Sequence, residues 1–239
     1  MDIHRPVVWV VGASRGIGRE IARQFAFIGC DVCLSARSRK DLKAAVGEIA
    51  SLGGRAYSFP CDITRQRSIL STARQIRKRF GDVDVLVNSA GITVFKTFLN
   101  TTPDEFRDIL ATNLYGPIVC TKAVLPTMVK RRRGWIFNIL SNAAIKTFEG
   151  SAAYTAAKAG MHGLGRVLRE ELRASNVKVI NVIPGATDTE MWSPRDRGKH
   201  GHRMMKAKSV AETVLSVFHM PDDIVVDEIV LRPMMGDIS

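Results

Sequence analysis

Short apolar runs rich in Val and Ile alternate along the chain with amphipathic stretches of helical period. The first run, Val7–Val11, precedes a stretch from Gly16 to Ile28 whose apolar side chains recur every three or four residues. The same alternation continues to the last run, Ile224–Leu231. It predicts further strands at 31–36, 56–59, 83–88, 135–140 and 177–183, and helices at 40–52, 65–80, 103–131 with a break near Asn113, 151–175 and 210–219.

Strands that alternate with helices favour a parallel sheet covered on both faces. We therefore expect an α/β fold, a single-domain Rossmann-like doubly wound parallel sheet of about seven strands flanked by helices on both faces. The length of 239 residues, with no linker or internal repeat, predicts one dinucleotide-binding and catalytic domain over residues 1–239. Within it, residues 186–208 are polar and basic, which favours a mobile substrate loop.

Composition narrows the class of protein. No apolar stretch approaches the 18 residues of a membrane span, and the N-terminus lacks the pattern of a secretion signal, so we expect a soluble cytoplasmic protein. Cys30 and Cys33 have the spacing of a redox pair but stand at the start of a strand, and we expect reduced, buried thiols there. We expect no metal site.

The net charge of +12 favours an anionic partner, which leaves a phosphorylated cofactor, an acidic carrier protein or nucleic acid as candidates. Much of the excess is local, in Lys130–Arg133 and Arg195–Lys208, and simple solvation of the surface is the alternative. The Arg131–Arg133 cluster is the one feature that favours nucleic acid, and cations at a helix C-terminus explain it better, so we expect no nucleic-acid partner.

A glycine-rich loop joins the first strand to the first helix. Its sequence is Gly12-Ala13-Ser14-Arg15-Gly16-Ile17-Gly18. Glycines let the backbone turn tightly and approach a diphosphate, and the helix N-terminus offers unpaired N–H groups to it. The loop therefore predicts a dinucleotide site.

This spacing, Gly-x-x-x-Gly-x-Gly, resembles the fingerprint of the short-chain dehydrogenase/reductase family, with Val11 in place of the usual Thr. The second strand ends in Ala36-Arg37-Ser38, without the carboxylate that would bond the ribose of NAD. Arg37 can pair with a 2′-phosphate, and the resemblance assigns Arg15 to the same phosphate. We therefore expect NADP as the cofactor.

Three further segments resemble those with which the family binds its cofactor. Asp62-Ile63 follows the third strand, Asn88-Ser89-Ala90-Gly91 follows the fourth with Ser89 in place of an Asn, and Pro184-Gly185-Ala186-Thr187-Asp188-Thr189 follows the sixth. The resemblance implies contacts to cofactor from Gly12, Ser14, Arg15, Gly16, Ile17, Gly18, Arg37, Asp62, Ile63, Asn88, Ala90, Gly91, Tyr154, Lys158, Pro184, Gly185, Thr187 and Thr189.

Tyr154 and Lys158 lie four residues apart, so they share one face of a helix. Ser141 ends the fifth strand, at the sheet edge where doubly wound folds bind ligands. Reduction of a carbonyl places negative charge on its oxygen, which requires a proton donor, and we expect Lys158 to lower the pKa of the Tyr154 hydroxyl. The resemblance assigns catalysis to Asn113, Ser141, Tyr154 and Lys158.

The leading hypothesis is an NADP-dependent oxidoreductase that reduces a ketone or aldehyde or oxidises the alcohol. A 3-oxoacyl-[acyl-carrier-protein] reductase is a narrower alternative, because the chain is similar to that subgroup. A non-catalytic NADP-binding regulatory protein is an alternative of another class. The residues expected to line the substrate pocket are apolar, which suggests a small or medium apolar carbonyl compound: Ile92, Phe95, Ala143, Phe148, Met191 and Trp192.

The expected assembly is a homotetramer, because small residues make the helix at 151–175 thin enough to pack closely against a neighbour. They are Ala152, Ala153, Ala156, Ala157, Ala159, Gly160, Gly163 and Gly165. The C-terminus departs from the family pattern, because Val230-Leu231-Arg232-Pro233 stands where the family often has Gly-Gly and makes an oligomer contact. An acidic acyl carrier protein is a candidate partner, with Arg131–Arg133, Arg166, Arg169 and Arg173 expected on the exposed surface it would meet.

Overall fold

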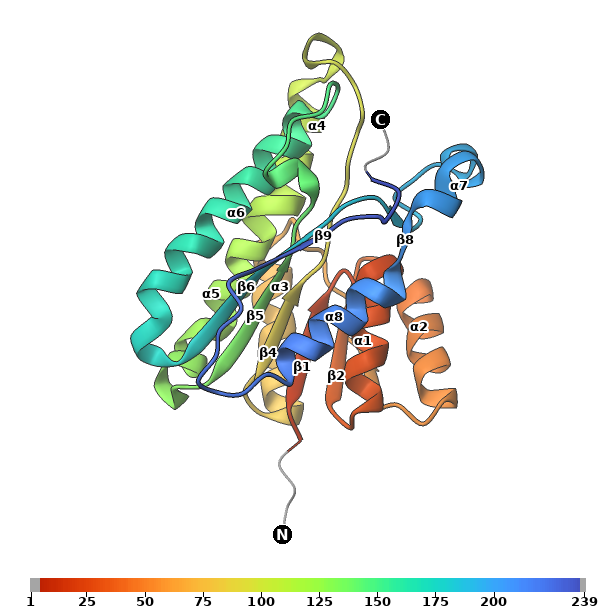
Figure 1. The fold of residues 1–239 in the computed structure, drawn as a ribbon. Coiled ribbons are helices and arrows are strands. Elements are labelled where there is room, and N and C mark those ends of the chain that lie inside the picture. Colours follow the sequence, from red (N-terminus) through yellow and green to blue (C-terminus); the bar gives the residue numbers. More distant parts are fainter. Residues whose placement is uncertain (1–4, 237–239) are drawn as a thin grey trace.

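The structure, a computed structural model, describes residues 5–236. Within that range one parallel sheet dominates the fold (Figure 1). Its strands, in the order in which they lie side by side, are β3 (Ala56–Ser58), β2 (Asp31–Ser35), β1 (Val7–Val11), β4 (Val85–Asn88), β5 (Gly134–Ile139), β6 (Val177–Pro184) and β9 (Glu228–Leu231). The strand order reverses direction at β1, which confirms the doubly wound single-domain fold expected from the sequence.

Helices cover both faces of the sheet. One face carries α1 (Gly16–Phe27), α2 (Arg39–Ser51) and α8 (Ala207–Phe218), and the other carries α3 (Gln66–Phe80), α5 (Gly116–Arg131) and α6 (Ala152–Leu172) (Figure 1). Most bounds agree with the sequence pattern to within a few residues. Strand β9 is shorter than the apolar run at 224–231: its register with β6 begins at Glu228, and just before it the Asp227 carbonyl accepts from the Asn181 N–H.

Alternation along β1 builds two separate cores. Val8 and Val10 face α1, α2 and α8 and belong to one buried cluster, whereas Val7, Trp9 and Val11 face α3 and α5 and belong to another. A strand buried on both faces loses almost all exposure, and all of β1 is buried. The two cores hold the helices against the sheet. Because the strands are parallel, their carboxyl ends all lie at one edge of the sheet, the upper edge in Figure 1.

The predicted break near Asn113 is wrong, because the helix continues through it. Helix α4 (Pro103–Leu110) passes directly into a π-helical turn, η2 (Ala111–Tyr115), and then into α5. A π turn accommodates one extra residue without ending the helix, and such turns are frequent at functional sites. The sequence pattern registers this extra residue only as an interruption of the helical period.

Residues 186–208 have more secondary structure than the sequence indicates. Two short strands, β7 (Thr187–Asp188) and β8 (Met205–Lys206), pair in parallel and close the segment at its base. Between them lies α7 (Pro194–His200), whose first turn is capped by the Ser193 hydroxyl accepting from the Asp196 N–H. Mobility of this segment stays a prediction.

The expectation of reduced, buried cysteines is confirmed. All four thiols are free and buried. Burial raises the pKa of the Cys30 thiol to about 12, with smaller contributions from Asp84 and Asp31. Thiols held protonated in this way are poor nucleophiles and poor redox groups, so they contribute to packing.

Candidate active site

The glycine-rich loop packs tightly against the turn that follows β4. Gly12 has φ +88°, and a Cβ built on it would lie 2.5 Å from the backbone nitrogen of Ala90. No residue other than glycine meets both conditions. Helix α1 begins at Gly16 without a side-chain cap from Arg15, so its first-turn N–H groups stay available. This backbone cradle fits a diphosphate, because nothing projects into it and N–H donors surround it.

A cavity of about 760 Å³ opens at the carboxyl ends of the central strands. It brings together residues from the glycine loop, the end of β2, the turn after β4, the end of β5, α6 and the segment after β6. Of the predicted residues it is lined by Gly12, Ser14, Arg15, Gly16, Ile17, Gly18, Arg37, Ile63, Ala90, Gly91, Ile92, Phe95, Ser141, Ala143, Phe148, Tyr154, Lys158, Pro184, Gly185, Thr187, Thr189, Met191 and Trp192. Three predicted residues, Asp62, Asn88 and Asn113, are not part of this lining.

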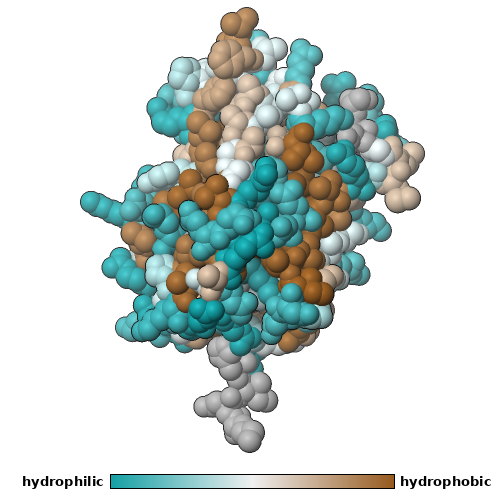
Figure 2. Space-filling view, turned by 60° about the vertical axis from the view of Figure 1, so that its left-hand side comes forward, coloured by the Kyte–Doolittle hydropathy of each residue, from teal (hydrophilic) through white to brown (hydrophobic). Residues whose placement is uncertain are grey.

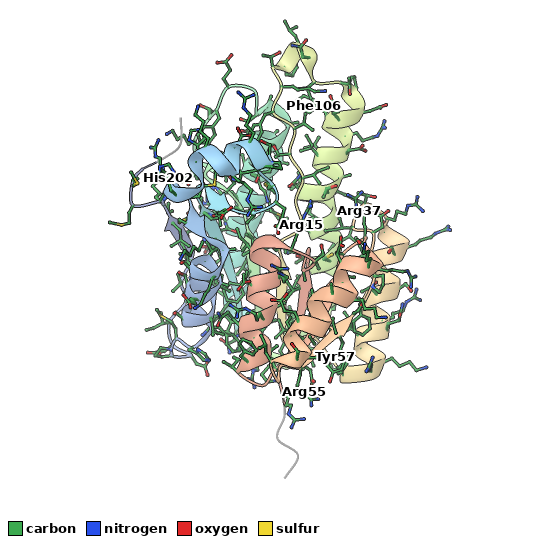
Figure 3. The ribbon with its side chains drawn as sticks, turned by 90° about the vertical axis from the view of Figure 1, so that its right-hand side faces the viewer. Arg15, Arg37, Arg55, Tyr57, Phe106 and His202 are labelled. Atoms are coloured by element: carbon green, nitrogen blue, oxygen red, sulfur yellow. The ribbon has the colours of Figure 1, made fainter. Side chains whose placement is uncertain are left out.

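Arg15 and Arg37 lie at the same end of the molecule. Both are exposed and both line the cavity. Figure 3 shows them near the upper ends of α1 and α2, well away from Arg55 and Tyr57 at the opposite edge of the sheet. The sequence interpretation missed one neighbour, because Asp41 in the first turn of α2 also lines the cavity. A carboxylate there would oppose a bound phosphate, and its position beside the cavity depends on how α2 packs on the sheet.

Asp62 uses its carboxylate locally. Its Oδ1 accepts from the Thr64 N–H at 3.0 Å and from the Thr64 hydroxyl at 2.7 Å, and Arg65 pairs with it. Burial raises the pKa of Asp62, but the Thr64 hydrogen bonds and the Arg65 and Arg37 cations outweigh it and keep the pKa below the usual value. The carboxylate stays ionised, and its contact with an adenine ring stays a prediction.

Asn88 belongs to a chain of buried amides that crosses three strands. Its Nδ2 donates to Asn138 Oδ1 at 3.0 Å, Asn138 Nδ2 donates to Asn181 Oδ1 at 3.2 Å, and Asn181 Nδ2 donates to the His162 carbonyl on α6 at 3.2 Å. Asn88, Asn138 and Asn181 occupy matching positions on β4, β5 and β6. This ladder ties the turn after β4 to the helix that carries Tyr154.

Asn113 lies inside the π turn and is buried. Its Nδ2 donates to the carbonyls of Ile92 and Ile109, both at 2.9 Å. The π turn displaces the helical hydrogen bonds, and the Asn113 side chain satisfies the Ile109 carbonyl. Asn113 Oδ1 has no partner in the described part of the chain, which leaves it able to accept from water or a bound ligand.

Tyr154 and Lys158 are buried one turn apart on α6. Lys158 Nζ lies 5.6 Å from the centre of the Tyr154 ring and donates to the Ile139 carbonyl of β5 at 2.9 Å. Ser141 stands immediately after β5, where its Oγ accepts from the Ala143 N–H. A side-chain hydrogen bond also joins Ser141 to Tyr154. A hydroxyl pair and an ammonium group therefore meet in one cavity with the glycine loop.

The expected lowering of the Tyr154 pKa is wrong for the protein alone. Burial raises the pKa of the Tyr154 hydroxyl to about 12, although the Ser141 hydrogen bond acts in the opposite direction. Burial also lowers the pKa of Lys158 to about 8. Both shifts favour the uncharged forms, because removal from water penalises phenolate and ammonium alike. The hydroxyl is thus held in its proton-donating form.

The substrate end of the cavity has polar groups that the sequence did not single out. Thr93, Asn142 and Glu149 line it together with the predicted apolar residues, whereas Glu190 lines the cavity near Gly16 of the glycine loop. Thr93 Oγ1 is buried and finds no hydrogen-bond partner among residues 5–236. The cavity therefore offers hydrogen-bond acceptors and donors as well as apolar surface. In the sequence, the only signal for these polar residues is that they lie next to predicted site residues.

The expected basic surface is only partly exposed. Arg169 is buried, where its Nε donates to the Val179 carbonyl and its Nη2 to the Asp227 carbonyl. Arg173 pairs with Glu170, and Arg131 pairs with Asp84. Placing Arg169 on the exposed half of α6 was therefore wrong. Its long side chain reaches under the helix to the sheet edge, which helical periodicity does not reveal.

Metal-ligand clusters and membrane-spanning helices are both absent from residues 5–236. No group of three or more metal-ligating side chains comes together there. No helix in that range is both long and apolar enough to cross a membrane.

Comparison with known proteins identifies the family. The model of the family described as short chain dehydrogenase matches residues 6–200. The chain is 34% identical to a sepiapterin reductase of Chlorobaculum tepidum over 98% of each chain, and 36% identical to a 3-oxoacyl-[acyl-carrier-protein] reductase of Bos taurus over 76% of each. The chain therefore belongs to the short-chain dehydrogenase family and is an oxidoreductase of that class.

Solved structures agree with this assignment. A metagenomic short-chain oxidoreductase in complex with NADP has a TM-score of 0.85 and 34% identity, covering 96% of this chain and 97% of its own. An alcohol dehydrogenase from the archaeon Thermococcus sibiricus, complexed with 5-hydroxy-NADP, has a TM-score of 0.89 and 27% identity, covering 98% and 99%.

Proposed function

We propose that the chain is an NADPH-dependent reductase of ketones or aldehydes, with Tyr154 as the proton donor to the carbonyl oxygen. The observation that carries the proposal is the meeting of Ser141, Tyr154 and Lys158 in the cavity that the glycine loop also lines. NADP as the cofactor is supported by Arg15 and Arg37 in the lining and by the NADP complexes among the similar structures.

The residues divide the work of carbonyl reduction. Gly12, Gly18, Arg15 and Arg37 would hold the cofactor, which supplies a hydride when bound. As negative charge develops on the carbonyl oxygen, the Tyr154 hydroxyl donates its proton to that oxygen. Ser141 donates a hydrogen bond to the same oxygen and fixes its position.

Lys158 and Asn113 support the proton donor. The Lys158 ammonium places positive charge beside the Tyr154 ring and stabilises the phenolate that remains after proton transfer. Asn113 Oδ1, unpaired among the described side chains, is available to a water molecule that returns a proton to the site.

A screen of NADPH oxidation against mixed ketones and aldehydes tests the proposal. We expect turnover by the wild type and none by Tyr154→Phe, while the Tyr154→Phe variant still binds NADPH. Binding of NADPH without turnover of any carbonyl compound by the wild type would instead favour the non-catalytic regulatory alternative.

A carrier-bound 3-oxoacyl substrate is the second candidate. The named bovine relative favours it, and so do Lys130, Arg132 and Arg133, for which no ion pair is found in residues 5–236. The buried Arg169 and the paired Arg173 reduce the basic surface available to a carrier. Comparing kcat/KM for one 3-oxoacyl group, free as a small thioester and attached to carrier protein, at low and high salt, decides between the two.

A homotetramer built on α6 is part of the proposal. Ala156, Ala159, Gly160 and Gly163 are exposed along one side of α6, and Val167 continues this row. Small side chains at helical spacing let a second helix approach closely. We place the enzyme in the cytoplasm as part of the same proposal.

A further inference from the structure

Two aromatic side chains outside the apolar cores face each other in the catalytic cavity. The rings of Phe95 and Trp192 are stacked, with centroids 6.3 Å apart and planes at 27°. Both line the cavity that contains Ser141 and Tyr154, and neither belongs to the buried clusters that stabilise the fold. Phe95 is 61% exposed, so much of its ring stays open to a ligand in the cavity.

Phe95 stands on the loop that adjoins the start of α6. The N–H of its neighbour Lys96 donates to the Gly150 carbonyl at 2.9 Å, and Gly150 precedes the first turn of the helix that carries Tyr154. A third ring, Phe148, lines the cavity from the same side. The loop therefore holds Phe95 at the reacting end of the cavity, away from Arg15 and Arg37.

Trp192 approaches from the opposite segment. Its neighbour Met191 places Cε 3.7 Å from the position of a Cβ on Gly91, and Lys158 Nζ lies 3.8 Å from that same point. The backbone N–H of Trp192 donates to the Thr189 carbonyl, and Arg197 pairs with Asp188 at 2.6 Å to anchor α7 beside it. These contacts hold the backbone of Trp192 at the base of the segment that follows β6, and its ring stacks on Phe95.

The aliphatic side chains that line other parts of the cavity make this aromatic surface informative. Apolar burial alone needs only aliphatic side chains, such as Ile92 and Met191, which are already present. Stacked rings add an orientation-dependent attraction for another flat ring that aliphatic groups do not share. A flexible acyl chain gains nothing from this additional interaction.

We propose that Phe95 and Trp192 are specificity-determining residues that select carbonyl compounds in which the carbonyl is attached to a flat aromatic or heteroaromatic ring. The inference rests on the proposed carbonyl reductase function and names its substrate class. The rings bind the flat part of the substrate while Ser141 and Tyr154 engage the carbonyl oxygen.

A matched pair of ketones tests the inference. Acetophenone and cyclohexyl methyl ketone have the same carbon skeleton, one with a flat ring and one with a puckered ring. We expect Trp192→Leu and Phe95→Leu each to lower kcat/KM for acetophenone about threefold to tenfold, and to change kcat/KM for the cyclohexyl ketone less than twofold. Dividing each variant by the wild type on the same ketone removes the intrinsic difference in reactivity.

Two further variants serve as controls. Trp192→Phe keeps an aromatic face and should retain most of the activity on acetophenone. Phe98→Leu removes an exposed ring that does not line the cavity, and should leave both ratios at the wild-type value. Equal losses on both ketones in the Leu variants, or no loss on either, would overturn the inference.

Binding provides a readout that does not require turnover. Trp9 and Trp135 are buried, so Trp192 is the tryptophan that a ligand in the cavity can reach. We expect saturable quenching of fluorescence by 1-(4-nitrophenyl)ethanol, lost in Trp192→Phe. Wild-type protein that reduces no carbonyl compound but shows this quenching would refute the proposed function and support the ring site. Absence of saturable quenching in an enzyme that reduces ketones would refute the ring site alone.

Discussion

Adding one methyl group at the contact between α6 and β6 should strongly lower the free energy of unfolding. A Cβ on Gly165 would lie 2.3 Å from Asn181 Oδ1 and 2.8 Å from Asn181 Nδ2. Asn181 is fully buried, accepts from Asn138 and donates to the His162 carbonyl, so it has no room to move without losing those bonds. Gly165→Ala must therefore displace either α6 or the end of the amide ladder.

The magnitude follows from three effects. Overpacking costs about 1–3 kcal/mol, and a displaced buried amide costs about 1–3 kcal/mol more. The higher helix propensity of Ala offsets about 1 kcal/mol. We expect the free energy of unfolding to fall by about 1–5 kcal/mol, which lowers Tm by roughly 2–4 °C for each kcal/mol.

The matched control is Gly47→Ala in the middle of α2. A Cβ on Gly47 meets nothing within 4 Å, so the same chemical change should stabilise the protein by about 0.5–1 kcal/mol. Thermal and urea unfolding of both variants measure the difference, and kcat of Gly165→Ala reports whether Tyr154 has moved with α6. Equal stability of the two variants would show that α6 does not rest on Asn181 as the structure has it.

The remaining predictions concern catalysis and cofactor binding in the cavity, and the assembly. Tyr154→Phe should lower kcat at least a thousandfold while the Kd for NADPH changes less than threefold, which stopped-flow and fluorescence titration measure. NADPH should bind at least tenfold more tightly than NADH, and Arg15→Ala with Arg37→Ala should remove most of that preference; a wild type that binds both cofactors equally would contradict it. The Kd for NADPH should rise about tenfold from pH 7 to pH 9, measured by the same titration. Light scattering should give the mass of a tetramer, and a monomer would refute the proposed packing of α6.

The sheet and most of its helices were predictable because each element has a strong local signal. Buried parallel strands read as apolar runs, and their helices carry one apolar face. The π turn was not predictable, since one extra residue in a helix and a true break disturb the period in the same way. Helix α7 was missed because its polar composition hides it, although Ser193 before Pro194 has the pattern of a helix start.

The candidate site was predictable where residue type and spacing carry the information. Tyr154 and Lys158 share a helix face because they are four residues apart, whatever the rest of the fold. The glycine loop acts through its backbone, so its spacing alone identifies it. The position of Asp41 beside the cavity and the burial of Arg169 depend on how helices pack on the sheet, which the pattern does not specify. The direction of the Tyr154 pKa shift likewise depends on burial, which only the structure supplies.

The two opposed pKa shifts determine how the site responds to pH. With its pKa raised to about 12, Tyr154 stays protonated throughout the neutral range, so the fraction of enzyme that carries the proton for reduction is constant there. With its pKa lowered to about 8, Lys158 changes from mostly charged at pH 7 to about one-tenth charged at pH 9. Because Lys158 is an expected contact of the cofactor through its ammonium, we expect the affinity for NADPH to fall by that same factor as pH rises. Stability moves the other way, because between pH 8 and 10.5 the unfolded chain binds more protons at this lysine than the folded chain does, so unfolding becomes less favourable with rising pH. General alkaline unfolding would lower both the affinity for NADPH and the free energy of unfolding. A lower affinity together with a higher free energy of unfolding over this interval would therefore identify the titration of Lys158.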